Sequence, residues 1–128
     1  HIDAKNGGCE VYMAPFAVII QNDIKNYVEP DICIICDKDK LSDRGCEGAP
    51  DWIIEIVSPS SRKIDYIIKN TAYSRAGVRE YWIVDPAKAC TTVYDYDKDA
   101  APTIIPFDQP VQCGIFPDLS IIVSDYLK

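Results

Sequence analysis

A single carboxylate stands in the middle of an uninterrupted apolar run. Residues 52–57 read Trp-Ile-Ile-Glu-Ile-Val, so neither alternating face of the segment is polar except at Glu55. This pattern predicts a strand covered on both sides of a β-sheet. Because an unpaired charge in such a strand would cost several kcal/mol, Glu55 is expected to be protonated, paired with a cationic side chain, or bound to a metal ion.

A second acid precedes another apolar run. Asp31 follows Glu29 and Pro30 and leads into Ile-Cys-Ile-Ile-Cys at residues 32–36, which is also typical of a buried strand. If the two strands are neighbours, Asp31 and Glu55 can share one face of the sheet. Asp51 points the same way as Glu55 by the strand period of two, but it lies at the start of the strand and is the weaker candidate.

Length and charge limit the class of protein. The chain has 128 residues, of which 48% are hydrophobic, and this predicts one globular domain over residues 1–128. Its apolar runs are far shorter than the roughly 20 residues that span a bilayer, so we expect a cytoplasmic protein without a membrane partner. A net charge of −7 disfavours nucleic acid, which would need a local basic patch or a bound metal. The basic residues concentrate at Arg62, Lys63, Lys69, Arg75 and Arg79.

Six cysteines do not form a zinc motif. Cys33 and Cys36 have C-x-x-C spacing, but on a strand they point to opposite faces, and no second pair or histidine cluster completes a site. We expect all six to be reduced, structural thiols.

The order of elements indicates an α/β fold with a mixed sheet flanked by helices. Strands are expected at residues 9–14, 16–20, 31–36, 51–57, 78–85 and 91–96, with a turn at 21–26. A helix is expected from Arg62 to Ala76, ended by Gly77, and would connect two parallel strands. Its predicted buried stripe is Ile64, Ile67, Ile68 and Thr71. Residues 119–127 could be a strand or a short helix. Residues 1–8 look like the end of a preceding helix, so we expect an N-terminal helix to be missing from this chain.

Four motifs together resemble a known family. They are Pro-Asp at 30–31, Gly-Ala-Pro-Asp-Trp-Ile-Ile-Glu-Ile-Val-Ser-Pro-Ser-Ser at 48–61, Asp-x-x-x-Lys-x-x-x-Tyr at 65–73, and Ala-Gly-Val-Arg-Glu-Tyr-Trp-Ile-Val-Asp-Pro at 76–86. This pattern resembles the Uma-type putative restriction endonuclease family of the PD-(D/E)XK nuclease superfamily. The resemblance implies a restriction-endonuclease-like mixed sheet.

The resemblance also implies a site and a chemistry. Asp31 and Glu55 match the two acids of the superfamily motif, and Lys69 of the following helix replaces the lysine expected where Val57 stands. Many family members carry an acid where this chain has Ala17. The implied activity is Mg²⁺- or Mn²⁺-dependent endonuclease hydrolysis of phosphodiester bonds in DNA. Asp31 and Glu55 would be the metal ligands, and the Ile56 carbonyl is a possible third. A homodimer is possible, because cutting both strands of a duplex usually takes two sites.

Purely structural roles remain open for the same residues. Asp31 could cap a turn, and Glu55 could form a buried structural ion pair with Lys69. Asp65 and Lys69 have the spacing of a helical i,i+4 ion pair, and Tyr73 could serve packing alone. The alternative function is a catalytically degenerate nuclease fold that acts as a binding or interaction module.

Overall fold

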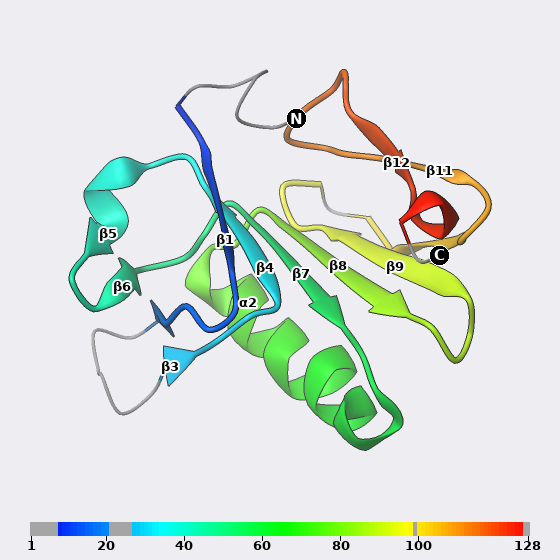
Figure 1. The fold of residues 1–128 in the computed structure, drawn as a ribbon, viewed down its shortest axis with the longest axis horizontal. Coiled ribbons are helices and arrows are strands. Elements are labelled where there is room, and N and C mark those ends of the chain that lie inside the picture. Colours follow the sequence, from blue (N-terminus) through cyan, green and yellow to red (C-terminus); the bar gives the residue numbers. More distant parts are fainter. Residues whose placement is uncertain (1–7, 21–26, 99, 127–128) are drawn as a thin grey trace.

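The central element is a six-stranded mixed sheet. The computed structural model describes residues 8–20, 27–98 and 100–126. The strand order across the sheet is β1-β4-β7-β8-β9-β10, and only β7 and β8 are parallel neighbours (Figure 1). The strands are β1 Glu10–Met13, β4 Ile32–Ile35, β7 Trp52–Ile56, β8 Glu80–Asp85, β9 Cys90–Asp95 and β10 Thr103–Pro106. The predicted mixed α/β sheet is therefore present.

Short strands form two smaller sheets. One has the order β3-β2-β6-β5 and the other pairs β11 with β12. Their bounds are β2 Val18–Ile19, β3 Tyr27–Val28, β5 Leu41–Ser42, β6 Gly45–Glu47, β11 Pro110–Gln112 and β12 Ser120–Ile122. Single 3₁₀ turns lie at Lys38–Lys40, Pro59–Ser61 and Val123–Asp125. The segment predicted as a strand or a short helix, described here to residue 126, contains a short strand followed by a 3₁₀ turn.

The two faces of the central sheet are buried by different elements. Alternation along β7 sends Ile53 to one apolar cluster, which contains Tyr73 of the helix, and Trp52 to another, which contains Val111 and Phe116 of the C-terminal segment. The helix therefore covers one face of the sheet. The C-terminal segment, which contains β11 and β12, covers the other face in place of a second helix.

A continuous helical segment joins the parallel strands β7 and β8. It contains a π-helix, Ile64–Lys69, and the α-helix α2, Asn70–Ala76. Gly77 ends it at φ 100°, a left-handed conformation that suits glycine at a helix C-terminus. The predicted helix ending at Gly77 is confirmed, although its first half is π rather than α. Within the described residues, none of the helices is long and apolar enough to cross a membrane.

The predicted buried stripe of this helix is wrong. Ile64, Ile67 and Ile68 are 46%, 59% and 56% exposed, whereas Asp65 and Tyr73 are buried. The helix carries a second stripe, one residue further along, formed by positions 65, 69 and 73. That stripe faces the sheet because its polar groups find partners there, so their burial leaves no charge unpaired.

The expectation that all cysteines are reduced is also wrong. Cys9 and Cys36 form a disulfide, which links the residue before β1 to the residue after β4. Cys33, Cys46, Cys90 and Cys113 are free thiols. The apolar sequence around Cys9 and Cys36 is compatible with free thiols and with a disulfide. The antiparallel pairing of β1 with β4 is what brings the two sulfurs together. The expected helical end over residues 1–7 and the turn at 21–26 lie outside the described residues.

Replacing isoleucine by alanine once in the core and once on the helix should show whether the isoleucine face of the helix is exposed. Ile53→Ala in the fully buried core should lower the free energy of unfolding by about 2–5 kcal/mol through lost contacts and a cavity. Ile67→Ala, the same change on the exposed face, should alter it by less than about 0.5 kcal/mol. Urea unfolding followed by circular dichroism measures both. A loss of unfolding free energy for Ile67→Ala as large as that for Ile53→Ala would show that the isoleucine face of the helix is packed against the sheet.

Candidate functional site

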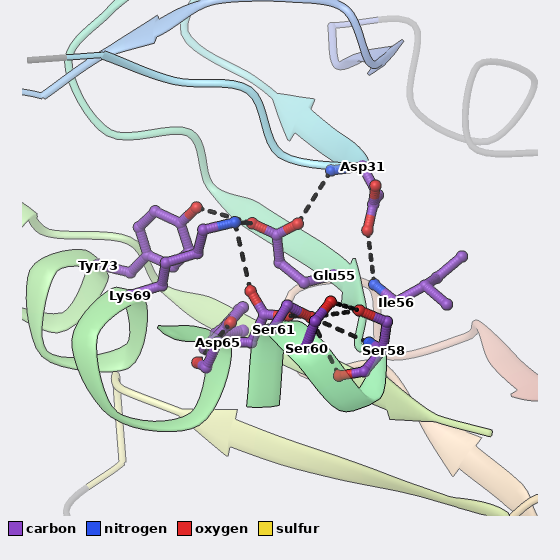
Figure 2. A network of polar contacts seen from close by, with 10 residues as sticks. Asp31, Glu55, Ile56, Ser58, Ser60, Ser61, Asp65, Lys69 and Tyr73 are labelled. Atoms are coloured by element: carbon purple, nitrogen blue, oxygen red, sulfur yellow. Dashed lines mark hydrogen bonds and ion pairs between the residues drawn. The ribbon is translucent and has the colours of Figure 1, made fainter. Parts of the chain in front are cut away.

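The antiparallel pairing of β4 with β7 brings the two predicted acids together. Ile32 lies opposite Ile54, so Asp31, one residue earlier, comes next to Glu55. The backbone N–H of Asp31 donates to Glu55 Oε1 at 3.1 Å, and the backbone N–H of Ile56 donates to Asp31 Oδ2 at 2.7 Å. Each acid is therefore fixed by the backbone of the other strand (Figure 2).

Lys69 reaches the same carboxylate from the helix. Its ammonium lies 3.0 Å from Glu55 Oε2 and 3.3 Å from Asp65 Oδ1, and its side chain is 24% exposed. The other oxygen of Asp65, Oδ2, accepts a hydrogen bond from Ser61 Oγ at 2.8 Å. Figure 2 shows Glu55, Lys69 and Asp65 turned toward one another between β7 and the helix. One ammonium is thus shared by two buried carboxylates.

Tyr73 completes the surroundings of Glu55. Its hydroxyl, one helical turn beyond Lys69, donates to Glu55 Oε2 at 2.9 Å. Burial, and then the neighbouring Glu55 carboxylate, raise the pKa of Tyr73 far above its ordinary value. The tyrosine is consequently a neutral hydrogen-bond donor at any physiological pH.

Burial and charge act in opposite directions on the ion pair. Burial raises the pKa of Glu55, and the Lys69 ammonium, the Asp31 N–H and the Tyr73 hydroxyl only partly offset that rise. Burial works to lower the pKa of Lys69, but the Glu55 and Asp65 carboxylates outweigh it and the pKa is raised. Desolvation thus determines the direction of the pKa shift of the deeply buried Glu55, whereas the two neighbouring carboxylates determine that of the more exposed Lys69.

The donor set suits a hard cation held loosely. Asp31, Glu55 and Asp65 outnumber the single ammonium in charge, and carboxylate oxygens are the ligands that Mg²⁺ prefers. The described part of the chain contains no group of three His, Cys, Asp or Glu side chains that could hold a metal. Two carboxylates still fit Mg²⁺, which commonly keeps several waters and binds one or two carboxylates together with substrate phosphate.

The backbone at Ile56 is consistent with a further oxygen ligand. In an extended strand the N–H and C=O of one residue point toward the same side. Since the Ile56 N–H donates to Asp31, its carbonyl is directed toward the same edge of β7. These residues therefore fit a Mg²⁺ ion, although binding itself stays a prediction.

Two other candidates lie elsewhere or act differently. Asp51, at the start of β7, accepts from the Cys36 N–H at 2.9 Å and lies 3.5 Å from Arg79, so it belongs to the opposite end of the strand. Ser58 forms a capping box with Ser61, as expected for a residue that begins a helical segment.

Sequence reasoning missed two partners in the site. Tyr73 was interpreted as a residue that could serve packing alone, and Ser61 was not among the candidates, yet both donate to buried carboxylates. The four-residue spacing of Asp65, Lys69 and Tyr73, with Ser61 four residues before them, was the available signal. The isoleucine stripe on the same helix was predicted to be the buried face instead, because hydrophobic periodicity counts only apolar residues.

The fold has a similar solved counterpart. A crystal structure described as a putative nuclease belonging to DUF820, from Anabaena variabilis ATCC 29413, matches with a TM-score of 0.75 and 18% sequence identity. The match covers 97% of this chain and 70% of that one. At this identity the likeness establishes the fold, which is that of restriction-endonuclease-like nucleases.

A family model also matches the sequence. The model is that of Uma2, described as "Putative restriction endonuclease", and it matches residues 1–124. No curated protein matches the chain.

The raised pKa of Glu55 predicts a specific pH dependence of stability. A carboxyl whose pKa is higher when folded adds stability below its unfolded pKa, about 4.3, and loses that contribution as the pH rises through the folded value. Wild type should therefore lose stability relative to Glu55→Gln as the pH increases over this window. Urea unfolding of both proteins at several pH values measures the difference. Parallel pH profiles would contradict it.

Proposed function

Because this chain belongs to the Uma2 putative restriction endonuclease family, we propose that it is a Mg²⁺- or Mn²⁺-dependent endonuclease that hydrolyses phosphodiester bonds in DNA. One observation supports this most directly: Asp31, Glu55 and Lys69, from two strands and a helix, converge on one rim of the central sheet. The proposed metal ligands are Asp31 and Glu55, with the Ile56 carbonyl as a third.

A bound Mg²⁺ would supply Lewis-acid stabilisation of the phosphate and a more acidic water. The residues of the chain have complementary tasks. Asp31 and Glu55 supply anionic oxygen and are themselves fixed by backbone N–H groups and by Tyr73. Fixed ligands require no rearrangement when the substrate phosphate arrives, which is the condition for effective electrostatic catalysis.

Lys69 is suited to stabilising charge rather than to accepting a proton. Its raised pKa keeps the ammonium protonated, so it cannot serve as a general base near neutral pH. A compact ammonium with three donors can contact an attacking water or an oxygen of the phosphate that gains negative charge. We assign that role to Lys69, with Asp65 holding its side chain in place.

The approach of DNA depends on local rather than overall charge. The net charge of −7 opposes binding, but Lys63 and Arg75 lie on the same helical segment as Lys69, whereas Arg62 is ion-paired with Asp85. A bound metal would reduce the negative charge of the site further. Because double-strand cleavage needs two sites, the proposal includes a homodimer on duplex DNA.

A second function is favoured by one specific observation. Glu55 already has donors on both oxygens, so the ion pair is stable as a structural unit without any metal. This is what a catalytically degenerate member, retained as a binding module, would require. Cleavage and metal-binding assays separate the two functions.

Cleavage of DNA should depend on the helix lysine. With Mg²⁺ or Mn²⁺, wild type should nick or cut plasmid DNA, and Lys69→Ala should reduce the rate by about 10²–10³, the usual cost of losing one electrostatic donor. Lys38→Ala, at an exposed lysine outside this helical segment, is the control and should reduce it far less. Gel electrophoresis of nicked and linear products measures the rates. Equal rates for Lys69→Ala and wild type would remove Lys69 from the mechanism, and no cleavage by wild type would favour the binding module.

Metal binding should depend on the strand acids. Mg²⁺ or Mn²⁺ should raise the Tm of wild type, because a ligand that binds only the folded state stabilises it by mass action. Asp31→Asn should abolish this shift, whereas Asp39→Asn, at an exposed acid away from the site, should keep it. Differential scanning fluorimetry with and without the metal provides the measurement. A retained shift in Asp31→Asn would place the ion elsewhere.

A further inference from the structure

The π-turn that carries Asp65 and Lys69 has a side-chain partner on the sheet. Tyr81 of β8 lies opposite Ile53 of β7 in the parallel ladder and belongs to the same apolar cluster as Tyr73. Its hydroxyl donates to the backbone carbonyl of Asp65 at 2.9 Å, and both groups are buried. A donor from outside therefore reaches the backbone of the helix within the π segment.

A side-chain contact of this kind is one of the known sources of local departure from α-helical geometry. In an α-helix each carbonyl pairs with the N–H four residues later, whereas in a π-helix the pairing extends to five. Helices are locally altered where a side chain inserts into this hydrogen-bond ladder, and single π-turns occur frequently at functional sites. The π segment Ile64–Lys69 contains both Asp65 and Lys69, so its register decides where the ammonium lies.

Tyr81 also supports the other side of the lysine. Its ring meets that of Tyr73 edge-on, with centroids 5.0 Å apart and an interplanar angle of 82°. Tyr73 in turn donates to Glu55. Tyr81 thus touches the two helical residues that lie one turn before and one turn after Lys69. The Tyr81 side chain itself is fully buried.

We propose that Tyr81 is a positioning residue of the site, whose hydroxyl holds the π-turn in the register that presents Lys69 to Glu55 and Asp65. This inference rests on the proposed nuclease function for its kinetic consequence, but not for its structural one. The placement of Lys69 exists in the resting protein and can be measured there without DNA or metal.

Removing the hydroxyl alone tests the proposal. Tyr81→Phe keeps the ring and its contact with Tyr73, and should lower kcat about tenfold while KM changes less than about twofold, since a displaced catalytic group affects the rate more than binding. Tyr96→Phe is the matched control, because Tyr96 also donates to the backbone of this helical segment, at Asn70, beyond the π-turn. It should leave kcat within about twofold of wild type.

A second readout is independent of activity. In metal-free protein, NMR should show the nuclear Overhauser contacts between the Lys69 and Glu55 side chains lost in Tyr81→Phe but kept in Tyr96→Phe, because only the former moves the ammonium away from the two carboxylates. Unchanged Lys69 contacts in a folded Tyr81→Phe protein would overturn the proposal. Absence of DNA cleavage by wild type, with the Lys69 contacts present, would overturn the nuclease function and leave the positioning role standing.

A measurement on wild type covers the case in which Tyr81→Phe does not fold. The Tyr81 hydroxyl proton, if held by the Asp65 carbonyl, should exchange slowly with water and show a nuclear Overhauser contact to the backbone of the π-turn. Rapid exchange without that contact would overturn the proposal without any variant.

Discussion

The structure depends on how one buried carboxylate is satisfied. Glu55 lies in β7, one of the two central strands of a sheet covered on both faces, with 3% of its surface exposed. Three donors reach its carboxylate: the Asp31 N–H, the Lys69 ammonium and the Tyr73 hydroxyl. The Ile56 N–H donates in turn to the Asp31 carboxylate. Removing any of them would leave desolvated charge or an unpaired polar group, which is why the strand edge and the helix must both occupy fixed positions.

The orientation of the helix follows from that requirement. Either of two stripes of the helix could face the sheet. The stripe that does so contains an acid, a lysine and a tyrosine, and the stripe of three isoleucines faces away. Transfer of apolar surface would favour the isoleucines by a few kcal/mol. Leaving Glu55 without a cation would cost a comparable or larger amount, and the network lets Asp65, Lys69 and Tyr73 be buried with their hydrogen bonds made.

The same competition explains what the sequence could and could not reveal. Strand β7 and the acid within it were predictable, because an apolar run with one carboxylate has few structural solutions. The helix ending at Gly77 and the pairing of Asp31 with Glu55 were predictable from capping and motif spacing. The buried face of the helix was not, since hydrophobic periodicity weighs only apolar residues and ignores a charged partner across the interface. The Cys9–Cys36 bond required the β1–β4 pairing, which no local pattern encodes.

Four of the site residues, Glu55, Asp65, Lys69 and Tyr73, come from one continuous strand-and-helix unit, whereas Asp31 comes from β4. The ladder between β4 and β7 holds these two parts together. If β4 detached transiently from β7, Asp31 would leave with it while the lysine and its carboxylates stayed joined. Native-state hydrogen exchange would then report two opening events of different free energy, one that removes an acid from the rim and one that dissolves the ion pair. Occupancy by a cation would be sensitive to the first, and the integrity of the helix to the second.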